Sequence, residues 1–272
     1  MGEYAFSGAE IGNISLSGSI KEIAKGAFED AEISSVTIPE GVISVGESAF
    51  EGAALQEVVL PESLLFIKER AFSETLLEQI VLGKNVEEVG KRAFFNCTKL
   101  SSVTAQGNAV AYAEECFAQT PFLTEGKTAE NGGIYLGNTF LSFFNEGERA
   151  EVRYGTTDIL SLQSMTITSL KLPATLAQTP SVEDLPYLEQ LWLGIVPQGA
   201  EETAIDVGSQ KFRAKADHLY IYFPKYVTFS GELGDDVYIC YGGSASEFEK
   251  YARLDNIDGF YERVYYLDQN GS

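Results

Sequence analysis

The hydrophobic positions in the first 120 residues recur with a fixed period. A pair of alanine and phenylalanine returns every 22 residues, and a cysteine-phenylalanine pair follows at 23. A fixed period of this length is typical of a solenoid, in which one small structural unit is stacked many times. The pairs are Ala5-Phe6, Ala27-Phe28, Ala49-Phe50, Ala71-Phe72, Ala93-Phe94 and Cys116-Phe117.

A second pattern within each period predicts a short β-strand with one buried face. In the segment Ile33-x-x-Val36-x-Ile38-Pro39, positions 36 to 38 alternate in, out and in, and the proline ends the strand. A small residue such as Ala31 stands three positions after each phenylalanine. Each coil therefore offers apolar side chains to a shared interior that only stacking can bury. The equivalent segments begin at Ile11, Ile33, Leu55, Leu77 and Leu100.

The strand pattern continues in the second half, but its spacing wanders and the Ala-Phe half of the unit is missing after Phe117. We expect strands near residues 152–155, 167–173, 188–194, 219–224 and 237–242. Between the halves, two apolar runs over residues 134–144 are separated by Gly137-Asn138. This arrangement predicts a β-hairpin.

These motifs resemble the BspA-type leucine-rich repeat family of bacteria, whose unit is approximately LxxLxLP followed by VxxIGxxAFxxC. The match is close over residues 1–120, as in Val45-Gly46-Glu47-Ser48-Ala49-Phe50 and Phe94-Phe95-Asn96-Cys97, and weaker afterwards. The resemblance implies a mainly β leucine-rich repeat solenoid, with short parallel strands on a curved face and short helical or 3-10 turns. It also implies a hairpin inserted after Thr120-Pro121-Phe122-Leu123 and a C-terminal strand-helix cap that contains Glu249-Lys250-Tyr251-Ala252.

We therefore expect one elongated domain over residues 1–272, since a solenoid has no size limit from a central core. Its expected parts are regular repeats over 1–120, the hairpin insertion over 121–150, degenerate repeats over 151–236 and the cap over 237–272. Met1 stands where the repeat wants isoleucine. We expect from this that the chain is cut from a longer precursor with an upstream cap or export signal.

The charge balance disfavours several classes of partner. The chain carries 40 acidic and 19 basic residues, for a net charge of −21. Nucleic acids and anionic membranes attract clustered lysine and arginine, so neither is an expected partner. No stretch approaches 18 consecutive apolar residues, so we expect no membrane insertion. Surface acids of this kind keep exposed strands soluble.

The residues that could carry chemistry are few. Cys97 and Cys116 fill small interior positions in adjacent coils, which leaves a disulfide between them open, whereas Cys240 is expected to point outward as the more reactive thiol. One histidine, His218, cannot supply a histidine metal cluster or a catalytic triad by itself. The segment around Asp255 lacks carboxylates at the first and twelfth positions of a calcium loop. We therefore predict no enzyme activity, no metal and no cofactor.

The outward positions of the strands are the candidate binding residues. In the first half they are small and polar apart from two valines, and in the second half they become basic and then aromatic. Aromatic residues and arginine are favoured at contact surfaces because they give a large area at low entropy cost. Alternatively, these side chains cover one another without any ligand. The candidate partner-binding residues are Val59, Val81, Arg153, Lys171, Trp192, Tyr220, Tyr222 and Tyr238.

The leading hypothesis is a non-enzymatic binding or adhesion module outside the cell that recognises protein or glycan through the curved strand face. The resemblance implies surface or secreted proteins, but it carries no ligand over to this chain. The second hypothesis is a structural spacer in a larger cell-surface protein. An enzyme that uses tyrosine, aspartate and glutamate residues within 194–240 is the third.

Overall fold

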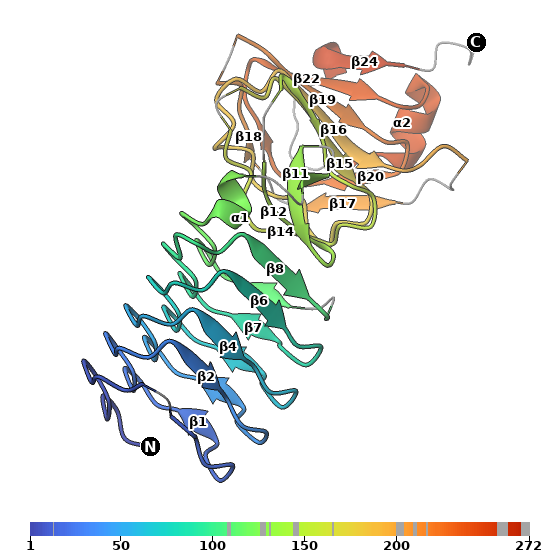
Figure 1. The fold of residues 1–272 in the computed structure, drawn as a ribbon. Coiled ribbons are helices and arrows are strands. Elements are labelled where there is room, and N and C mark those ends of the chain that lie inside the picture. The colour runs from blue at the N-terminus through green and yellow to red at the C-terminus, as the bar shows by residue number, and fades with distance from the viewer. Residues whose placement is uncertain are drawn as a thin grey trace. The chain divides into compact units, whose positions relative to one another are not determined.

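In this computed structural model, short strands stacked side by side form most of the regular secondary structure (Figure 1). The structure describes residues 1–12, 14–107, 110–125, 129–130, 132–143, 147–164, 166–199, 204–208, 211–215, 217–254 and 261–267. The chain divides into two compact units. The first unit comprises Met1–Ala129 and Ile134–Asn138, and the second comprises Glu130–Gly133 and Thr139–Ser272. The expectation of a single domain stays a prediction.

The first unit is a mainly β solenoid, as its 22-residue period predicts. The predicted strands are β2 (Ser35–Thr37), β4 (Glu57–Val59), β6 (Gln79–Leu82) and β8 (Ser102–Ala105). They lie in succession along one side of the stack, with β2 pairing β4 and β6 pairing β8 in parallel (Figure 1). A second parallel sheet contains β1 (Glu22–Ile23), β3 (Ser44–Val45), β5 (Phe66–Ile67), β7 (Glu88–Val89) and β9 (Ala111–Tyr112).

A ladder of phenylalanine rings fills the interior of the first unit. Neighbouring rings from Phe6 to Phe117 stack with centroids 5.0–5.3 Å apart and with interplanar angles of at most 9°. The four rings from Phe28 to Phe94 are fully buried, which confirms the predicted core. At the far end, helix α1 (Pro121–Thr124) presents Phe122 edge-on to Phe117 at 5.7 Å, and this contact interrupts the parallel stacking.

The small residues after each phenylalanine let adjacent coils approach closely. The hydroxyl of Thr75 donates to the carbonyl of Phe72 at 2.9 Å, and the thiol of Cys97 donates to the same carbonyl at 3.0 Å. Cys97 and Cys116 are buried free thiols, so no disulfide joins them. Burial raises the pKa of Cys97 to about 11 and that of Cys116 to about 12. Both positions therefore serve packing, as predicted.

Each coil also contains two residues with left-handed backbone, in two columns along the first unit. One column includes Ser48 at φ 51°, Arg70 at φ 53° and Arg92 at φ 54°. This conformation costs a non-glycine residue about 1 kcal/mol or more. The cost is offset because each amide points at the next coil, as when the Ser48 N–H donates to the Glu69 carbonyl at 2.9 Å. Stacking thus stabilises a backbone that a single coil would not adopt.

The predicted hairpin segment forms two strands. β11 (Gly133–Leu136) and β12 (Thr139–Phe143) occupy the two apolar runs, and Gly137 begins the turn at φ 57°. β12 pairs in parallel with β14 (Asp158–Ile159) of the second unit. Phe144, at the end of the predicted run, lies outside the described residues.

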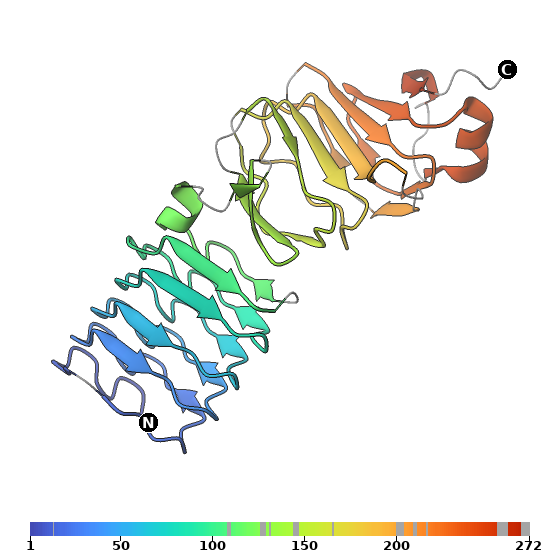
Figure 2. The same cartoon turned by 45° about the vertical axis from the view of Figure 1, so that its right-hand side comes forward.

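The second unit is built on one six-stranded parallel sheet, which we call the C-terminal sheet (Figure 1; Figure 2). The fully buried residues Leu191, Ile221 and Ile239 are in register on its inner face. Four of the five strands expected in this half are confirmed. In order across the sheet, its strands are β13 (Arg149–Glu151), β15 (Ser169–Pro173), β16 (Gln190–Ile195), β19 (Leu219–Phe223), β22 (Val237–Tyr241) and β24 (Val264–Tyr266).

The exception is β13, which lies at residues 149–151 and not at 152–155. The stretch between β16 and β19 contains two further strands that were not predicted, β17 (Ile205–Gly208) and β18 (Lys211–Phe212). β17 continues into a small sheet with β20 (Val227–Phe229) and β23 (Arg253–Leu254), while β18 pairs β21 (Glu232–Leu233). Phe229 lies 6.0 Å from Phe223 of the C-terminal sheet, so the small sheet shares its interior.

The predicted cap helix is α2 (Ala245–Tyr251). Ser244 and Glu247 form a capping box at its start, and Phe248 meets Tyr241 edge to face at 5.0 Å. The helix thus covers the end of β22. The 3-10 turn η1 (Tyr261–Arg263) precedes β24, and Arg263 donates to the carbonyls of Gly234 and Asp235 at 2.7 Å each.

Candidate functional site

The outward-facing side chains of the C-terminal sheet form two parallel rows, because strand residues alternate between the two faces. We call this surface the outer face. Strand register places the two rows on alternate positions, two residues apart, of every strand from β13 to β22. The first row is Glu151, Lys171, Trp192, Tyr222, Cys240 and Tyr265, and the second is Arg149, Ser169, Gln190, Tyr220 and Tyr238.

Trp192 and Tyr222 form the tightest ring contact on the outer face. Their ring centroids lie 3.6 Å apart with an interplanar angle of 1°. Tyr222 therefore stacks on one face of the indole, and the strand on the opposite side of Trp192 contributes Lys171. The rings hold each other upright on the sheet, so little side-chain freedom remains to be lost on binding.

A second aromatic cluster surrounds Tyr238. Tyr220 stacks on it with centroids 5.3 Å apart, while His218 approaches it edge-on at 5.5 Å. Tyr265 lies 6.1 Å away and is half exposed. His218 thus belongs to an aromatic surface cluster.

A groove opens on the outer face over β13, β15 and β16. Its volume is about 630 Å³. Trp192 forms one of its walls, and Glu151 pairs with Lys171 at 3.2 Å along it. On the same lining, the Ser169 hydroxyl donates to the Gln190 side-chain carbonyl at 3.4 Å. The other lining residues are Arg149 and Ala150.

The structure gathers five of the eight candidate residues on this surface: Lys171, Trp192, Tyr220, Tyr222 and Tyr238. The other three lie elsewhere. Arg153 lies beyond the end of β13, because the strand is three residues earlier than the sequence indicated. Val59 and Val81 are about half exposed on β4 and β6 of the first unit.

Sequence reasoning missed three residues of the outer face. Arg149 is the basic residue within β13, and Tyr265 continues the first row on β24. His218 was set aside as a metal ligand or triad member, and its place among the outer-face aromatic rings was not anticipated. The alternation in Val264-Tyr265-Tyr266 was the available signal for β24. For Arg149, the polar segment Arg149-Ala150-Glu151 gives no aliphatic pattern to follow.

Cys240 departs from its expected reactivity. It stands in the outward row between Tyr222 and Tyr265, yet only 6% of its surface is exposed. Burial raises the pKa of its thiol, which disfavours the reactive thiolate. The expectation of an accessible thiol is therefore wrong, because neighbouring side chains cover an outward-facing position.

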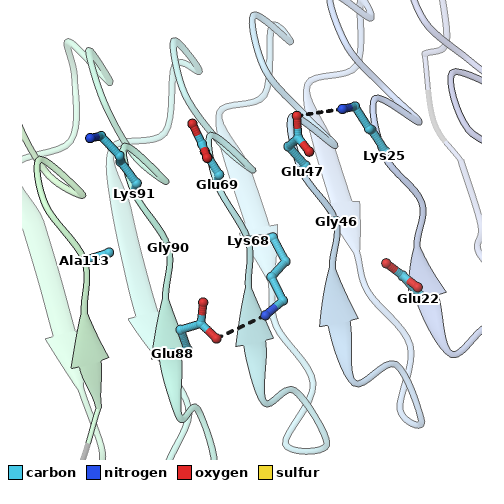
Figure 3. A pocket seen from close by; sticks show the side chains of 10 residues that line it. All are labelled: Glu22, Lys25, Gly46, Glu47, Lys68, Glu69, Glu88, Gly90, Lys91 and Ala113. Atoms are coloured by element: carbon cyan, nitrogen blue, oxygen red, sulfur yellow. Dashed lines mark hydrogen bonds and ion pairs between the residues drawn. The ribbon is translucent and has the colours of Figure 1, made fainter.

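A second hollow, of about 480 Å³, follows the sheet of β1, β3, β5, β7 and β9 in the first unit (Figure 3). Its charged side chains pair across coils, with Lys25 to Glu47 at 2.7 Å and Lys68 to Glu88 at 3.1 Å. The hollow has no aromatic lining. Such coil-to-coil ion pairs, formed at the surface, contribute little individually. We therefore place the candidate site on the outer face of the second unit.

The described residues contain no cluster of three or more histidine, cysteine, aspartate or glutamate side chains that could hold a metal ion. Among those same residues, none of the helices is both long and apolar enough to cross a membrane.

The regular repeats of the first unit match a known protein family. The model of the BspA type leucine rich repeat region matches residues 1–128, in six copies. Residues 1–128 are therefore similar to the BspA type leucine rich repeat family. This confirms the resemblance and the solenoid fold inferred from the repeats. A search of curated proteins found no match.

Solved structures of bacterial leucine-rich repeat proteins resemble this chain only distantly. A leucine-rich repeat protein from Bacteroides ovatus has 18% identity and a TM-score of 0.43 over 88% of this chain and 59% of its own. A leucine rich cell surface protein from Faecalibacterium prausnitzii has 20% identity and a TM-score of 0.33, over 84% and 65%. The pneumococcal vaccine antigen PcpA has 13% identity and a TM-score of 0.37, over 82% and 79%. The chain thus spans 59% of the Bacteroides ovatus protein.

Proposed function

We propose that this chain is a non-enzymatic binding module, exposed outside a bacterial cell, that recognises protein or glycan through the outer face of the C-terminal sheet. The observation that carries the proposal is the groove beside the stacked Trp192–Tyr222 pair. Rigid aromatic rings next to several polar groups are the features that recognition sites combine. The extracellular placement rests on the BspA type repeat family.

The proposed function is tested by a binding screen against matrix proteins and a glycan array. The wild-type chain is compared with a Trp192→Ala/Tyr222→Ser double variant. A Tyr187→Ala variant is the control, because Tyr187 is an aromatic residue of the second unit that is 53% exposed and absent from the groove lining. We expect binding that the double variant loses and the control keeps. Binding that survives in the double variant would contradict the proposed site.

The alternative is a structural spacer, and one observation favours it. The aromatic side chains of the outer face contact one another, as Tyr220 and Tyr238 do at 5.3 Å, and such pairs stabilise sheets without any ligand. A spacer predicts that no protein or glycan in the screen binds. It also predicts that the double variant changes only the free energy of unfolding.

A further inference from the structure

We propose that the groove beside Trp192 binds an acidic glycan, with one sugar ring stacked on the open face of the indole and its carboxylate paired with Arg149. This inference rests on the proposed function and narrows it to one ligand class. It follows from the ring geometry, the groove size and the charge of the lining.

The indole of Trp192 presents one available face, and that face is toward the groove. Tyr222 stacks on the opposite side at 3.6 Å, and it does not line the groove, whereas Lys171 on the neighbouring strand does. A pyranose ring has a face of C–H groups that carry partial positive charge, and an aromatic face carries partial negative charge. A sugar ring can therefore lie flat against Trp192 without any movement of the wall.

The size and lining of the groove favour a short saccharide over a protein surface. At about 630 Å³, its volume lies within the usual range for small-molecule sites. A stable protein interface needs roughly 1,000 Å² or more of complementary surface with an apolar core. Here one aromatic wall is accompanied by the polar side chains of Ser169 and Gln190, which can exchange hydrogen bonds with sugar hydroxyls.

The charge of the lining selects an acidic sugar. The groove contains two cationic side chains, Arg149 and Lys171, and one anionic side chain, Glu151. Lys171 is paired with Glu151 at 3.2 Å, while within the described residues no ion pair involves Arg149. A cationic excess is notable in a chain with a net charge of −21. The guanidinium offers a two-pronged contact that matches a carboxylate.

Trp192 makes the test unusually direct, because it is the only tryptophan of the chain. Tryptophan fluorescence therefore reports on the groove alone. We would titrate the whole chain with trigalacturonic acid, trisialic acid and neutral maltotriose, and follow the emission. The proposal expects a saturable change with at least one acidic trisaccharide. It also expects the neutral sugar to bind at least about tenfold more weakly than the acidic one. Added salt should weaken binding of the acidic sugar.

Two variants locate the site, and one matched control checks it. Trp192→Ala, followed by calorimetry, should weaken binding by about 30-fold or more, as loss of an aromatic anchor does. Arg149→Gln should weaken the acidic sugar by about tenfold and leave neutral-sugar binding unchanged. The control is Lys211→Gln, which removes a cation of β18 that pairs with Glu232 at 3.0 Å outside the groove, and it should change neither.

The outcomes separate this inference from the proposed function. The acidic-glycan assignment would be overturned if Arg149→Gln bound the acidic sugar as tightly as the wild type does. It would also be overturned if the wild type bound the neutral sugar more tightly than the acidic one. If no saccharide binds while a matrix protein binds through Trp192, the glycan assignment fails and the proposed function stands. If nothing binds at all, both fail and the spacer alternative is supported.

Discussion

The two units differ in where their parallel-stacked aromatic rings lie. In the first unit, phenylalanines such as Phe50 are stacked inside, and the outward residues of β2 to β8 are small, polar or valine. In the second unit, Trp192 and Tyr222 stack on the outer face while aliphatic residues such as Leu191 fill the layer beneath. The outward strand positions therefore carry small and polar side chains in the first unit and stacked rings in the second.

The largest expected effect tests the interior ladder of the first unit. Phe50→Ala should lower the free energy of unfolding by about 3–5 kcal/mol, because it removes a fully buried ring with stacked neighbours on both sides. Val59→Ala, at an exposed position of β4, should change it by less than about 0.5 kcal/mol. Urea denaturation followed by far-ultraviolet circular dichroism measures both. Equal losses would mean that the ladder is not the core.

A second prediction concerns how closely the coils of the first unit approach. A Cβ atom at Gly46 would lie 2.6 Å from the Ile23 carbonyl oxygen, so Gly46→Ala should destabilise by about 1–3 kcal/mol. Gly83→Ala, where the added atom meets open space, is the control in the same unit. In the second unit, Gly242→Ala meets Phe223 only at 3.4 Å and should cost less than Gly46→Ala. Thermal unfolding of the three variants checks this order.

The third prediction sharpens the comparison at the outer face. Tyr222→Ala should lower stability by about 0.5–1.5 kcal/mol beyond the lost burial, the usual contribution of an aromatic pair. It should also expose Cys240, which its neighbours now cover, so labelling with a thiol reagent should become faster. Cys97 and Cys116 are buried in the first unit and should remain unlabelled in the folded protein. Unchanged labelling would show that Tyr222 does not cover the thiol.

The smallest expected effect lies at the cap. Lys225 hydrogen-bonds Glu247 and lowers the pKa of that carboxyl to about 2 from 4.5. Because the folded value is depressed, its stabilisation is present above about pH 4.5 and is lost as the pH falls through about 2. Glu247→Gln should therefore be less stable than wild type at pH 6, and the difference should shrink toward pH 2.

The matched control for the cap is Glu249→Gln, which removes an exposed carboxylate from the same helix. It should leave the pH dependence of unfolding unchanged, as measured by urea denaturation at a series of pH values. A constant difference between Glu247→Gln and wild type across that series would contradict the assigned pKa.

The first unit was predictable from sequence because each coil repeats the same pattern of buried positions. The period alone identifies Phe28 and Phe50 as stacked and Cys97 as a buried small residue. β13 was misplaced because pairing with β15 sets its position, and Arg149-Ala150-Glu151 shows no apolar alternation of its own. The strands β17 and β18 were missed for a related reason, since they are only four and two residues long.

The candidate site was predictable in its members but not in its geometry. Strand alternation indicated that Trp192 and Tyr222 point outward, and the register then places them side by side. That the two rings stack in parallel, and that a groove opens beside Trp192, depends on side-chain packing between strands that are far apart in the sequence. The burial of Cys240 has the same origin, because its cover comes from other coils.

The left-handed backbone columns of the first unit have a consequence for how such a chain can change in length. Each column residue bonds to the coil after it, and every coil of this region offers the same carbonyls at the same places. If one whole repeat were lost or duplicated, the backbone amides at the new junction would therefore find equivalent carbonyl acceptors. The phenylalanine rings on either side of the junction would stack again. Recombination between repeats of the gene would shorten or lengthen this unit while keeping it folded. Among the described residues of the second unit, the coils are unequal in length and lack such columns, so the outer face would be inherited as a block.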